Sequence, residues 1–157
     1  MVLMNTGALL TNADHEANYC PLVGTWKLKS FEMSARDGTV IYPWGRETKG
    51  YATFTPDGYF FAAIMGADRK RFGSQDMKGG SLEEKASAAD SYITYCGPCE
   101  IQKDKFRTKV EVSLFPNWVG EYEERYYKIE GNTLFIWTDP MPVGGKELAG
   151  YLIWERV

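Results

Sequence analysis

Short apolar and aromatic runs separated by turn residues follow one another along the chain from Leu22 onward. In GTWKLKS, Trp26, Leu28 and Ser30 alternate with polar residues, which is the two-residue period of a half-buried strand. Two further runs flank Pro-Asp-Gly, so residues 50–65 are predicted to form a β-hairpin. Similar runs follow in KFRTKVEVSLFP, GEYEERYYKIE, NTLFIWT and GYLIWERV. The pattern predicts an all-β fold, a single closed barrel of about eight antiparallel strands.

One stretch departs from this period. Residues 66–80 are polar and rich in glycine, which indicates a long connection. Ser81 is then followed three residues later by Glu84, the spacing of a capping box. Apolar residues recur at helical spacing in the same stretch, at Leu82, Ala86, Ala89 and Ile93. We therefore expect one short helix over about residues 81–92.

The chain of 157 residues has no internal repeat, and this length fits one core. We expect a flexible N-terminal arm over residues 1–20 and one barrel domain over residues 21–157. The first residues lack the basic segment of a signal peptide, and three cysteines are too few for a disulfide scaffold. No apolar run approaches the roughly 20 residues that span a bilayer. These observations predict a cytoplasmic protein without a membrane partner.

Composition excludes several functions. With 18 basic and 21 acidic residues, the net charge is −3, so nucleic acid is not an expected partner. The single histidine, His15, leaves no histidine for a catalytic triad within the barrel and none for a His-rich metal site. No phosphate-binding loop is present. We expect neither a metal nor a cofactor, and any catalysis would be a proton shift, cyclisation or elimination carried by other side chains.

The sequence Cys96-Gly-Pro-Cys99 matches the dithiol motif of thioredoxins. In that fold the first cysteine begins a helix, whose dipole stabilises the thiolate. Here the predicted helix precedes the motif and a strand pattern follows it, so we interpret the motif as coincidence. Gly97 and Pro98 are expected to form a bulge or edge at a strand start. An incidental Cys96–Cys99 disulfide and a redox enzyme remain the alternatives.

Several motifs in order resemble the compact lipocalin-like domain family of bacteria and fungi, over about residues 22–157. They are Gly24-x-Trp26, GYATFTPDGYFFAAIM, YITYCGP, SLFPNW with the following RYY, and the final WERV. The resemblance implies an eight-stranded barrel with a central cavity, in which Arg156 packs over Trp26 by a cation–π contact. Thr108 and Lys109 stand where relatives often have a histidine pair, and Pro98 and Cys99 stand where a bulky residue commonly follows YCG. The first difference argues against a histidine-based mechanism. The second explains the dithiol as a local change on a barrel strand.

Inward-facing side chains define the ligand site of such a barrel. If Trp26 points inward, Leu28 and Ser30 do too, although Trp26 itself is most simply a plug at the barrel base. The strand EYEERYYKI places charged and aromatic side chains on one face, from which we select Arg125, Tyr127 and Glu123 as candidate catalytic residues. Solvent exposure of Glu123 and Arg125 is the competing interpretation. Candidate ligand-binding residues are Trp26, Phe54, Phe61, Met65, Trp118, Trp137 and Trp154.

The resemblance suggests that the barrel encloses a small, largely apolar organic molecule. Because some lipocalin-like proteins act as cyclases or isomerases in natural-product pathways, our leading hypothesis is a cofactor-free isomerisation or cyclisation in secondary metabolism. The alternative is a carrier or sequestering protein with the same cavity and no catalysis. Either a homodimer or a monomer with a covering helix fits the pattern.

Overall fold

The computed structural model describes residues 20–157. Almost all of the predicted N-terminal arm, and His15 with it, lies outside the described residues. Eleven strands, one α-helix and a short 3-10 helix make up the described fold. They are β1 (Gly24–Ala35), β2 (Val40–Ile41), β3 (Thr48–Phe54), β4 (Tyr59–Gly66), α1 (Leu82–Asp90), β5 (Tyr92–Ile101), β6 (Lys105–Lys109), β7 (Val112–Ser113), the 3-10 helix Pro116–Trp118, β8 (Tyr122–Glu130), β9 (Thr133–Trp137), β10 (Met141–Val143) and β11 (Lys146–Arg156).

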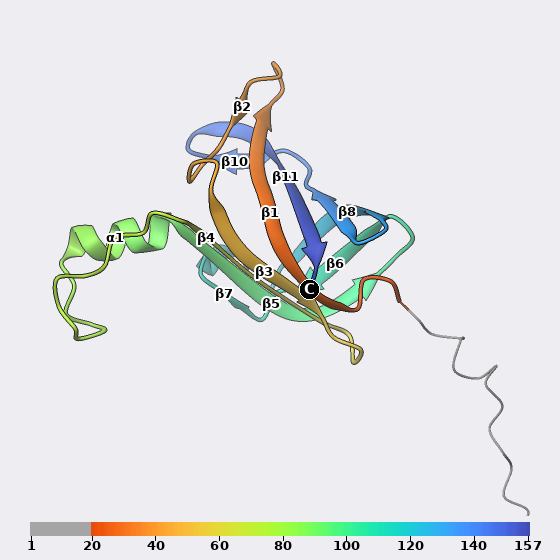
Figure 1. Ribbon diagram of the computed structural model, residues 1–157, viewed down its shortest axis with the longest axis horizontal. Coiled ribbons are helices and arrows are strands. Elements are labelled where there is room, and N and C mark those ends of the chain that lie inside the picture. Colours follow the sequence, from red (N-terminus) through yellow and green to blue (C-terminus); the bar gives the residue numbers. More distant parts are fainter. Residues whose placement is uncertain (1–19) are drawn as a thin grey trace, which may run out of the picture.

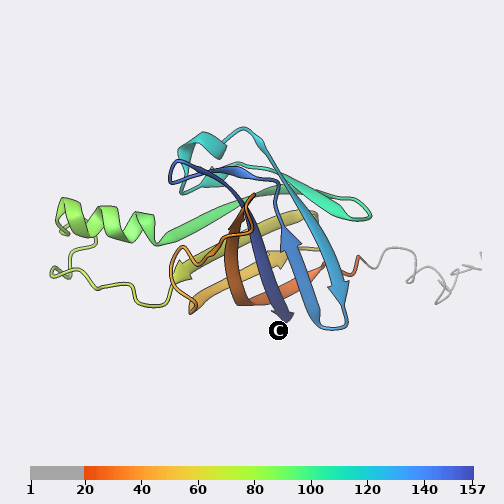
Figure 2. The same cartoon turned by 90° about the horizontal axis from the view of Figure 1, so that it is seen from above.

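Eight of these strands close a ring (Figure 2). Its order is β1-β3-β4-β5-β6-β8-β9-β11, and β11 pairs again with β1. All of these pairings are antiparallel, and the closing pair aligns Trp26 with Arg156 and Leu28 with Trp154. The predicted ring of eight antiparallel strands with one short helix is therefore confirmed. Because the first and last strands pair, the ring leaves no open edge between them.

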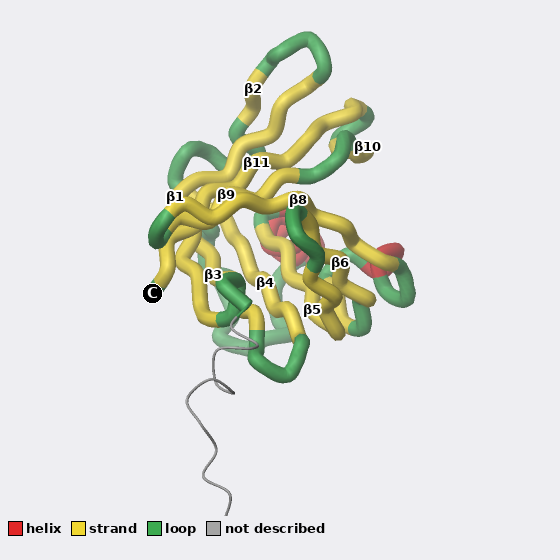
Figure 3. The backbone as a smooth tube through the Cα atoms, turned by 90° about the vertical axis from the view of Figure 1, so that its right-hand side faces the viewer, coloured by secondary structure: helices red, strands yellow, loops and turns green. Residues whose placement is uncertain are grey.

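The three remaining strands lie beside this ring. At one end, β2 and β10 extend the sheet from β1 and β11 (Figure 3). The third, β7, pairs with the part of β5 that β6 does not reach. The chain therefore leaves β6, turns and runs again along β5.

A β-bulge changes the inward face of β1. The register with β11 shifts between Leu28 and Ser30, so one extra residue reverses the alternation. Trp26 and Leu28 face inward before the bulge, whereas Phe31 and Met33 do so after it. The prediction that Ser30 shares the face of Trp26 is therefore wrong.

Helix α1 begins where the capping box predicts it. The Ser81 side chain accepts a hydrogen bond from the Glu84 N–H, and the Glu84 carboxylate accepts one from the Ser81 N–H. None of its residues is buried, and the Leu82 side chain is 87% exposed. Figure 1 shows the helix standing away from the ring of strands. A helix that covers the barrel, one of the two alternatives left open by the sequence, is therefore not observed. Ile93 belongs to β5 and not to the helix.

Gly97 lies inside β5, not at a strand start as expected. A Cβ atom at this position would lie 1.9 Å from the Lys109 carbonyl oxygen. The chain that leaves β6 crosses β5 at this point, as the hydrogen bond from the Glu111 N–H to the Cys96 carbonyl shows. Only glycine allows the two backbones to come this close.

The thiols of the dithiol motif lie on different sides of the sheet. Cys99 packs against the core, whereas Cys96 follows the outward alternation of Phe61 and Val112, its partners in the register. Both cysteines are free. This placement favours coincidence over a redox centre. Among residues 20–157, no helix has the length and apolar composition to cross a membrane.

Candidate functional site

One end of the barrel is plugged. Trp26 is fully buried and donates its indole N–H to the Leu22 carbonyl at 2.9 Å. The Arg156 guanidinium lies 4.1 Å from the Trp26 ring centroid and donates to the carbonyls of Val23 and Pro21 at 2.9 and 2.5 Å. The predicted cation–π contact is present. Trp26 thus fills the base, as the simpler interpretation of this residue expected.

Several inward side chains toward the opposite end are less completely buried than those around Trp26. Leu134 at the plugged end is fully buried, and Phe54 is 1% exposed. At the far end of the same interior, Phe31, Ile93 and Leu152 are only partly buried although they pack against the core. The end opposite Trp26 is therefore less completely packed than the plugged end, and we call it the mouth.

Aromatic side chains occupy the middle of the interior. The Phe54, Phe60 and Phe106 rings lie 4.7 to 5.1 Å apart between centroids. Tyr95 continues this cluster toward the mouth, with its ring 5.4 Å from that of Phe60. These rings pack on one another and form the core of the barrel.

An ion pair lies in this aromatic interior. The Glu123 carboxylate contacts the Arg125 guanidinium at 2.9 Å, and their side chains are 14% and 8% exposed. Both come from β8, where they face Thr108 and Phe106 of β6. The inward face predicted for this strand is thus observed, and the solvent-exposed alternative is wrong for these two residues. Because burying two charges is costly unless they are paired, the pair distinguishes this part of the interior.

Two aromatic rings hold the Arg125 guanidinium. Its central carbon lies 5.6 Å from the Tyr95 ring centroid and 5.7 Å from that of Trp118, within the range of cation–π contacts. The Trp118 ring also meets the Tyr95 ring edge-on at 5.4 Å. Burial raises the pKa of Tyr95, an effect that Arg125 partly offsets. Tyr95 therefore stays a neutral hydroxyl beside the ion pair.

Tyr127 is directed away from this pair. Its hydroxyl donates to the Gln102 carbonyl at 2.9 Å, in the turn between β5 and β6. Burial raises the pKa of Tyr127, and the nearby Cys20 thiol and Asp104 carboxylate raise it further. Although Tyr127 shares the inward face of Arg125, the structure does not bring its hydroxyl to Arg125.

Three predicted ligand-binding residues lie on the outer face. Phe60 is 2% exposed and its neighbour Phe61 46% exposed, so the inward side of β4 is the one carrying Phe60. Met65 falls on the same outer side as Phe61. Trp137 also faces outward and stacks on Tyr126 at 6.0 Å. The expectation that Phe61, Met65 and Trp137 face the cavity is corrected, because apolar residues lie on both sides of these strands. Phe54, Trp118 and Trp154 do lie inside or at the mouth.

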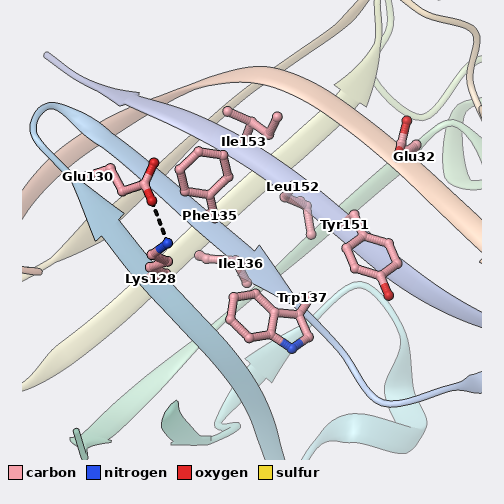
Figure 4. A pocket seen from close by; sticks show the side chains of 9 residues that line it. All are labelled: Glu32, Lys128, Glu130, Phe135, Ile136, Trp137, Tyr151, Leu152 and Ile153. Atoms are coloured by element: carbon pink, nitrogen blue, oxygen red, sulfur yellow. Dashed lines mark ion pairs between the residues drawn. The ribbon is translucent and has the colours of Figure 1, made fainter. Parts of the chain in front are cut away.

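A groove of about 490 Å³ lies on the outer side of the sheet and contains Trp137 (Figure 4). Strands β8, β9 and β11 form its floor, and Glu32 reaches it from β1. Phe135, Tyr151 and Ile153 line it, and the Lys128–Glu130 ion pair closes one side. It is separated from the interior by the sheet itself. No sequence pattern predicted this groove, because its residues come from strands distant in sequence.

Sequence reasoning also missed residues of the interior. Tyr95 lies within the YCGPC stretch, which we interpreted only through its two cysteines. Its alternation with Ile93 and Gly97 is visible in the sequence and would have placed it with them. Trp44 contacts the Phe31 ring at 5.5 Å and donates to the Asp90 carbonyl at 2.7 Å. It lies outside any regular strand, so periodicity carried no signal for it.

The site offers a fixed cation, a carboxylate and a phenol among aromatic rings. Such an arrangement can orient a polar group of an otherwise apolar molecule. A carboxylate within it can also accept a proton. In the part of the chain that the structure describes, no group of three or more metal-binding side chains comes together.

Comparison with known proteins places this fold in a family. Residues 23–157 match the model of the lipocalin-like domain. The 4'-hydroxy-3'-methoxypropiophenone carrier protein ppsC of Aspergillus oryzae (strain ATCC 42149 / RIB 40) is 29% identical over 105 residues, which cover 61% of this chain and 95% of that protein. A crystal structure of an uncharacterized protein from Bacteroides eggerthii DSM 20697 is 15% identical with a TM-score of 0.43, covering 87% of this chain and 99% of that one. Since the family model spans nearly all of the described chain, the protein belongs to the lipocalin-like domain family.

Proposed function

We propose that the barrel binds a small, largely apolar organic molecule through its mouth and carries it within a biosynthetic pathway. The buried Glu123–Arg125 pair is the observation on which this rests. Two charges inside an aromatic barrel weaken the fold relative to apolar residues of the same size. A role in recognising a polar group of a guest explains why they lie there.

The relative from Aspergillus oryzae supports a carrier in particular. Its name makes it a carrier of 4'-hydroxy-3'-methoxypropiophenone, an aromatic ketone. A molecule of this kind combines a flat ring with oxygen atoms. The rings of Phe60 and Tyr95 offer a stacking surface for the flat ring of the guest. The Arg125 guanidinium offers a charged hydrogen-bond donor to its oxygen atoms.

Isothermal titration of the protein with 4'-hydroxy-3'-methoxypropiophenone tests the proposal. Replacing both charges, Glu123→Gln with Arg125→Met, removes the polar anchor without leaving one charge alone. We expect the wild type to bind and this double variant to bind at least about tenfold more weakly, because a hydrogen bond to a charged group contributes more than 1 kcal/mol.

A matched control exists on the outer surface. Arg107 and Glu100 form an ion pair at 2.7 Å with side chains 42% and 54% exposed. The corresponding Glu100→Gln, Arg107→Met variant should bind as the wild type does. If the wild type fails to bind the ketone, or if the interior double variant binds it equally well, the proposed site is wrong.

A second candidate is catalysis of a cofactor-free isomerisation or cyclisation. It is favoured by one observation, namely that the Glu123 carboxylate lies in the same buried cluster as the neutral Tyr95 phenol and the Arg125 cation. In such a reaction the carboxylate would take a proton from carbon next to a carbonyl. Arg125 or Tyr95 would stabilise the enolate oxygen until the proton returns elsewhere.

Deuterium exchange separates the two candidates. The ketone is incubated with protein in D₂O, and incorporation at the carbon next to its carbonyl is followed by mass spectrometry. Exchange faster than in buffer, and lost in Glu123→Gln, would support an enzyme. Binding without accelerated exchange would support the carrier.

A further inference from the structure

Three buried side-chain polar atoms have no hydrogen-bond partner among residues 20–157. They are the indole nitrogen Nε1 of Trp154 and the hydroxyl oxygens Oγ1 of Thr108 and Thr48. Thr48 lies at the start of β3 and is only partly buried as a residue, so the other two are the deeply buried ones. The Trp154 residue is 2% exposed and Thr108 fully buried. Buried donors are nearly always paired in folded proteins, so each of these atoms requires an explanation.

The contrast with other tryptophans of the chain is informative. The Trp26 indole N–H donates to the Leu22 carbonyl, and that of Trp44 donates to the Asp90 carbonyl. Trp154 lies one inward position above Arg156 on β11 and is as buried as Trp26. The indole N–H of Trp26 at the base of the barrel is therefore hydrogen-bonded, whereas that of Trp154 has no partner in the part of the chain that the structure describes.

The surroundings of Trp154 argue against a water molecule as its partner. Its neighbours in the register are Leu28 on β1 and Leu134 on β9, which offer no polar side-chain atom. A buried water usually needs two to four polar partners. An oxygen atom that belongs to an apolar molecule needs only the one donor.

Thr108 contributes a second polar group, its side-chain hydroxyl, to the same interior. It faces Glu123 on β8 and Cys99 on β5 in the register. Burial raises the pKa of the Cys99 thiol, and the Thr108 hydroxyl lies close enough to offset part of this rise. A thiol is a weak hydrogen-bond partner, however, and no hydrogen bond of normal geometry joins the two. The free hydroxyl thus lies beside the ion pair, where it can donate to or accept from a guest.

We infer that the guest of the barrel carries a neutral acceptor oxygen, such as that of an aryl ketone, ether or phenol, which accepts the Trp154 Nε1–H. This inference rests on the proposed binding function and narrows its ligand class. A hydrocarbon would leave the indole N–H unpaired. The aromatic body of the guest lies among the rings of the interior, and Thr108 serves a second oxygen atom.

Propiophenone and propylbenzene form a matched pair of probes, because they differ by the carbonyl oxygen. We expect the wild type to bind propiophenone about tenfold more tightly than propylbenzene, the usual effect of one hydrogen bond to a buried donor. Trp154→Phe removes the N–H and keeps an aromatic ring. In this variant the ratio of the two affinities should fall severalfold. The ratio is compared within each protein, so a change in packing that affects both probes does not enter it.

The indole proton itself gives a direct signal. In an ¹H–¹⁵N spectrum, the indole resonance of Trp154 is identified by its loss in Trp154→Phe. Propiophenone should shift this resonance downfield, whereas propylbenzene should not. Equal affinity for the two probes, unchanged by the substitution and without a downfield shift, would overturn the inference and leave the binding function in place.

A test without ligand covers the case in which the wild type binds neither probe, which would contradict the proposed function. Trp26→Phe loses an indole hydrogen bond that the structure contains, while Trp154→Phe removes a donor without a partner. Urea unfolding of the free protein should therefore show a smaller fall in the midpoint for Trp154→Phe. An equal or larger fall would mean that the Trp154 N–H is already paired, which would overturn the inference.

Discussion

Replacing Glu123 by glutamine leaves the Arg125 guanidinium charged and without its carboxylate inside the barrel. Breaking a buried ion pair on one side costs about 3–5 kcal/mol of the free energy of unfolding. The lower end applies here, because Arg125 keeps its 2.7 Å hydrogen bond to the Glu124 carbonyl and the ring faces of Tyr95 and Trp118. We expect a loss of about 3 kcal/mol for Glu123→Gln, and a similar loss for Arg125→Met.

The double variant distinguishes pairing from simple loss of packing. With both charges removed, no uncompensated charge remains, so the loss should be smaller than the sum of the single losses. The coupling between the two residues should be at least about 2 kcal/mol. The exposed Glu100–Arg107 pair has a similar distance between its charged atoms, 2.7 Å against 2.9 Å for Glu123–Arg125. Its coupling should nevertheless be below about 1 kcal/mol, because solvent screens it.

Urea unfolding followed by tryptophan fluorescence measures these quantities. With a slope of about 2 kcal/mol per molar urea for a domain of this size, a loss of 3 kcal/mol lowers the midpoint by about 1.5 M. If the single losses at Glu123 and Arg125 add within about 0.5 kcal/mol in the double variant, the two side chains do not interact as the structure indicates. The burial argument for the functional site would then be wrong.

Three further predictions concern the crossing at β5, the base plug and the cysteines. Gly97→Ala places a methyl group 1.9 Å from the Lys109 carbonyl and should destabilise the fold by more than about 3 kcal/mol, whereas Gly73→Ala, with its nearest contact at 3.7 Å, should change the urea midpoint little. Arg156→Ala should lower the Tm by about 5–10 °C, and Arg156→Lys should restore less than half of that, since lysine lacks the forked donors. Burial raises the pKa of Cys99 from 9.0 to about 11, so at pH 8 its alkylation should be about 100-fold slower than in the urea-unfolded chain; equal rates would contradict this. Because the folded-state pKa is the higher one, the neutral thiol stabilises the fold below pH 9, and this contribution is lost as the pH rises toward 11.

Local sequence was sufficient for several features. The capping box fixed the start of α1, because both of its hydrogen bonds join residues only three positions apart. Alternation placed Glu123, Arg125 and Tyr127 on one face of β8, as the structure has it. The contact of Arg156 with Trp26 followed from a resemblance, and its physical basis is the pairing of the first and last strands.

Features that depend on distant partners could not be predicted in this way. Phe60 and Phe61 are equally apolar, and only pairing with β3 and β5 determines that Phe60 faces inward. The bulge in β1 that removed Ser30 from the inward face arises against β11, more than a hundred residues away. The direction of the Tyr127 hydroxyl depends on the Gln102 carbonyl in another turn.

The sequence by itself therefore determined the strands of the ring, the helix and the shared face of the charged residues, because these depend on spacing along one element. It did not indicate the three short strands β2, β7 and β10. Only the tertiary structure decided which face is inside, where β5 requires glycine and that α1 stands away from the barrel. It also decided that the polar side-chain atoms of Trp154 and Thr108 lack hydrogen-bond partners in the described part of the chain. Each of these depends on atoms brought together from different strands, and periodicity within one strand contains no information about its neighbours.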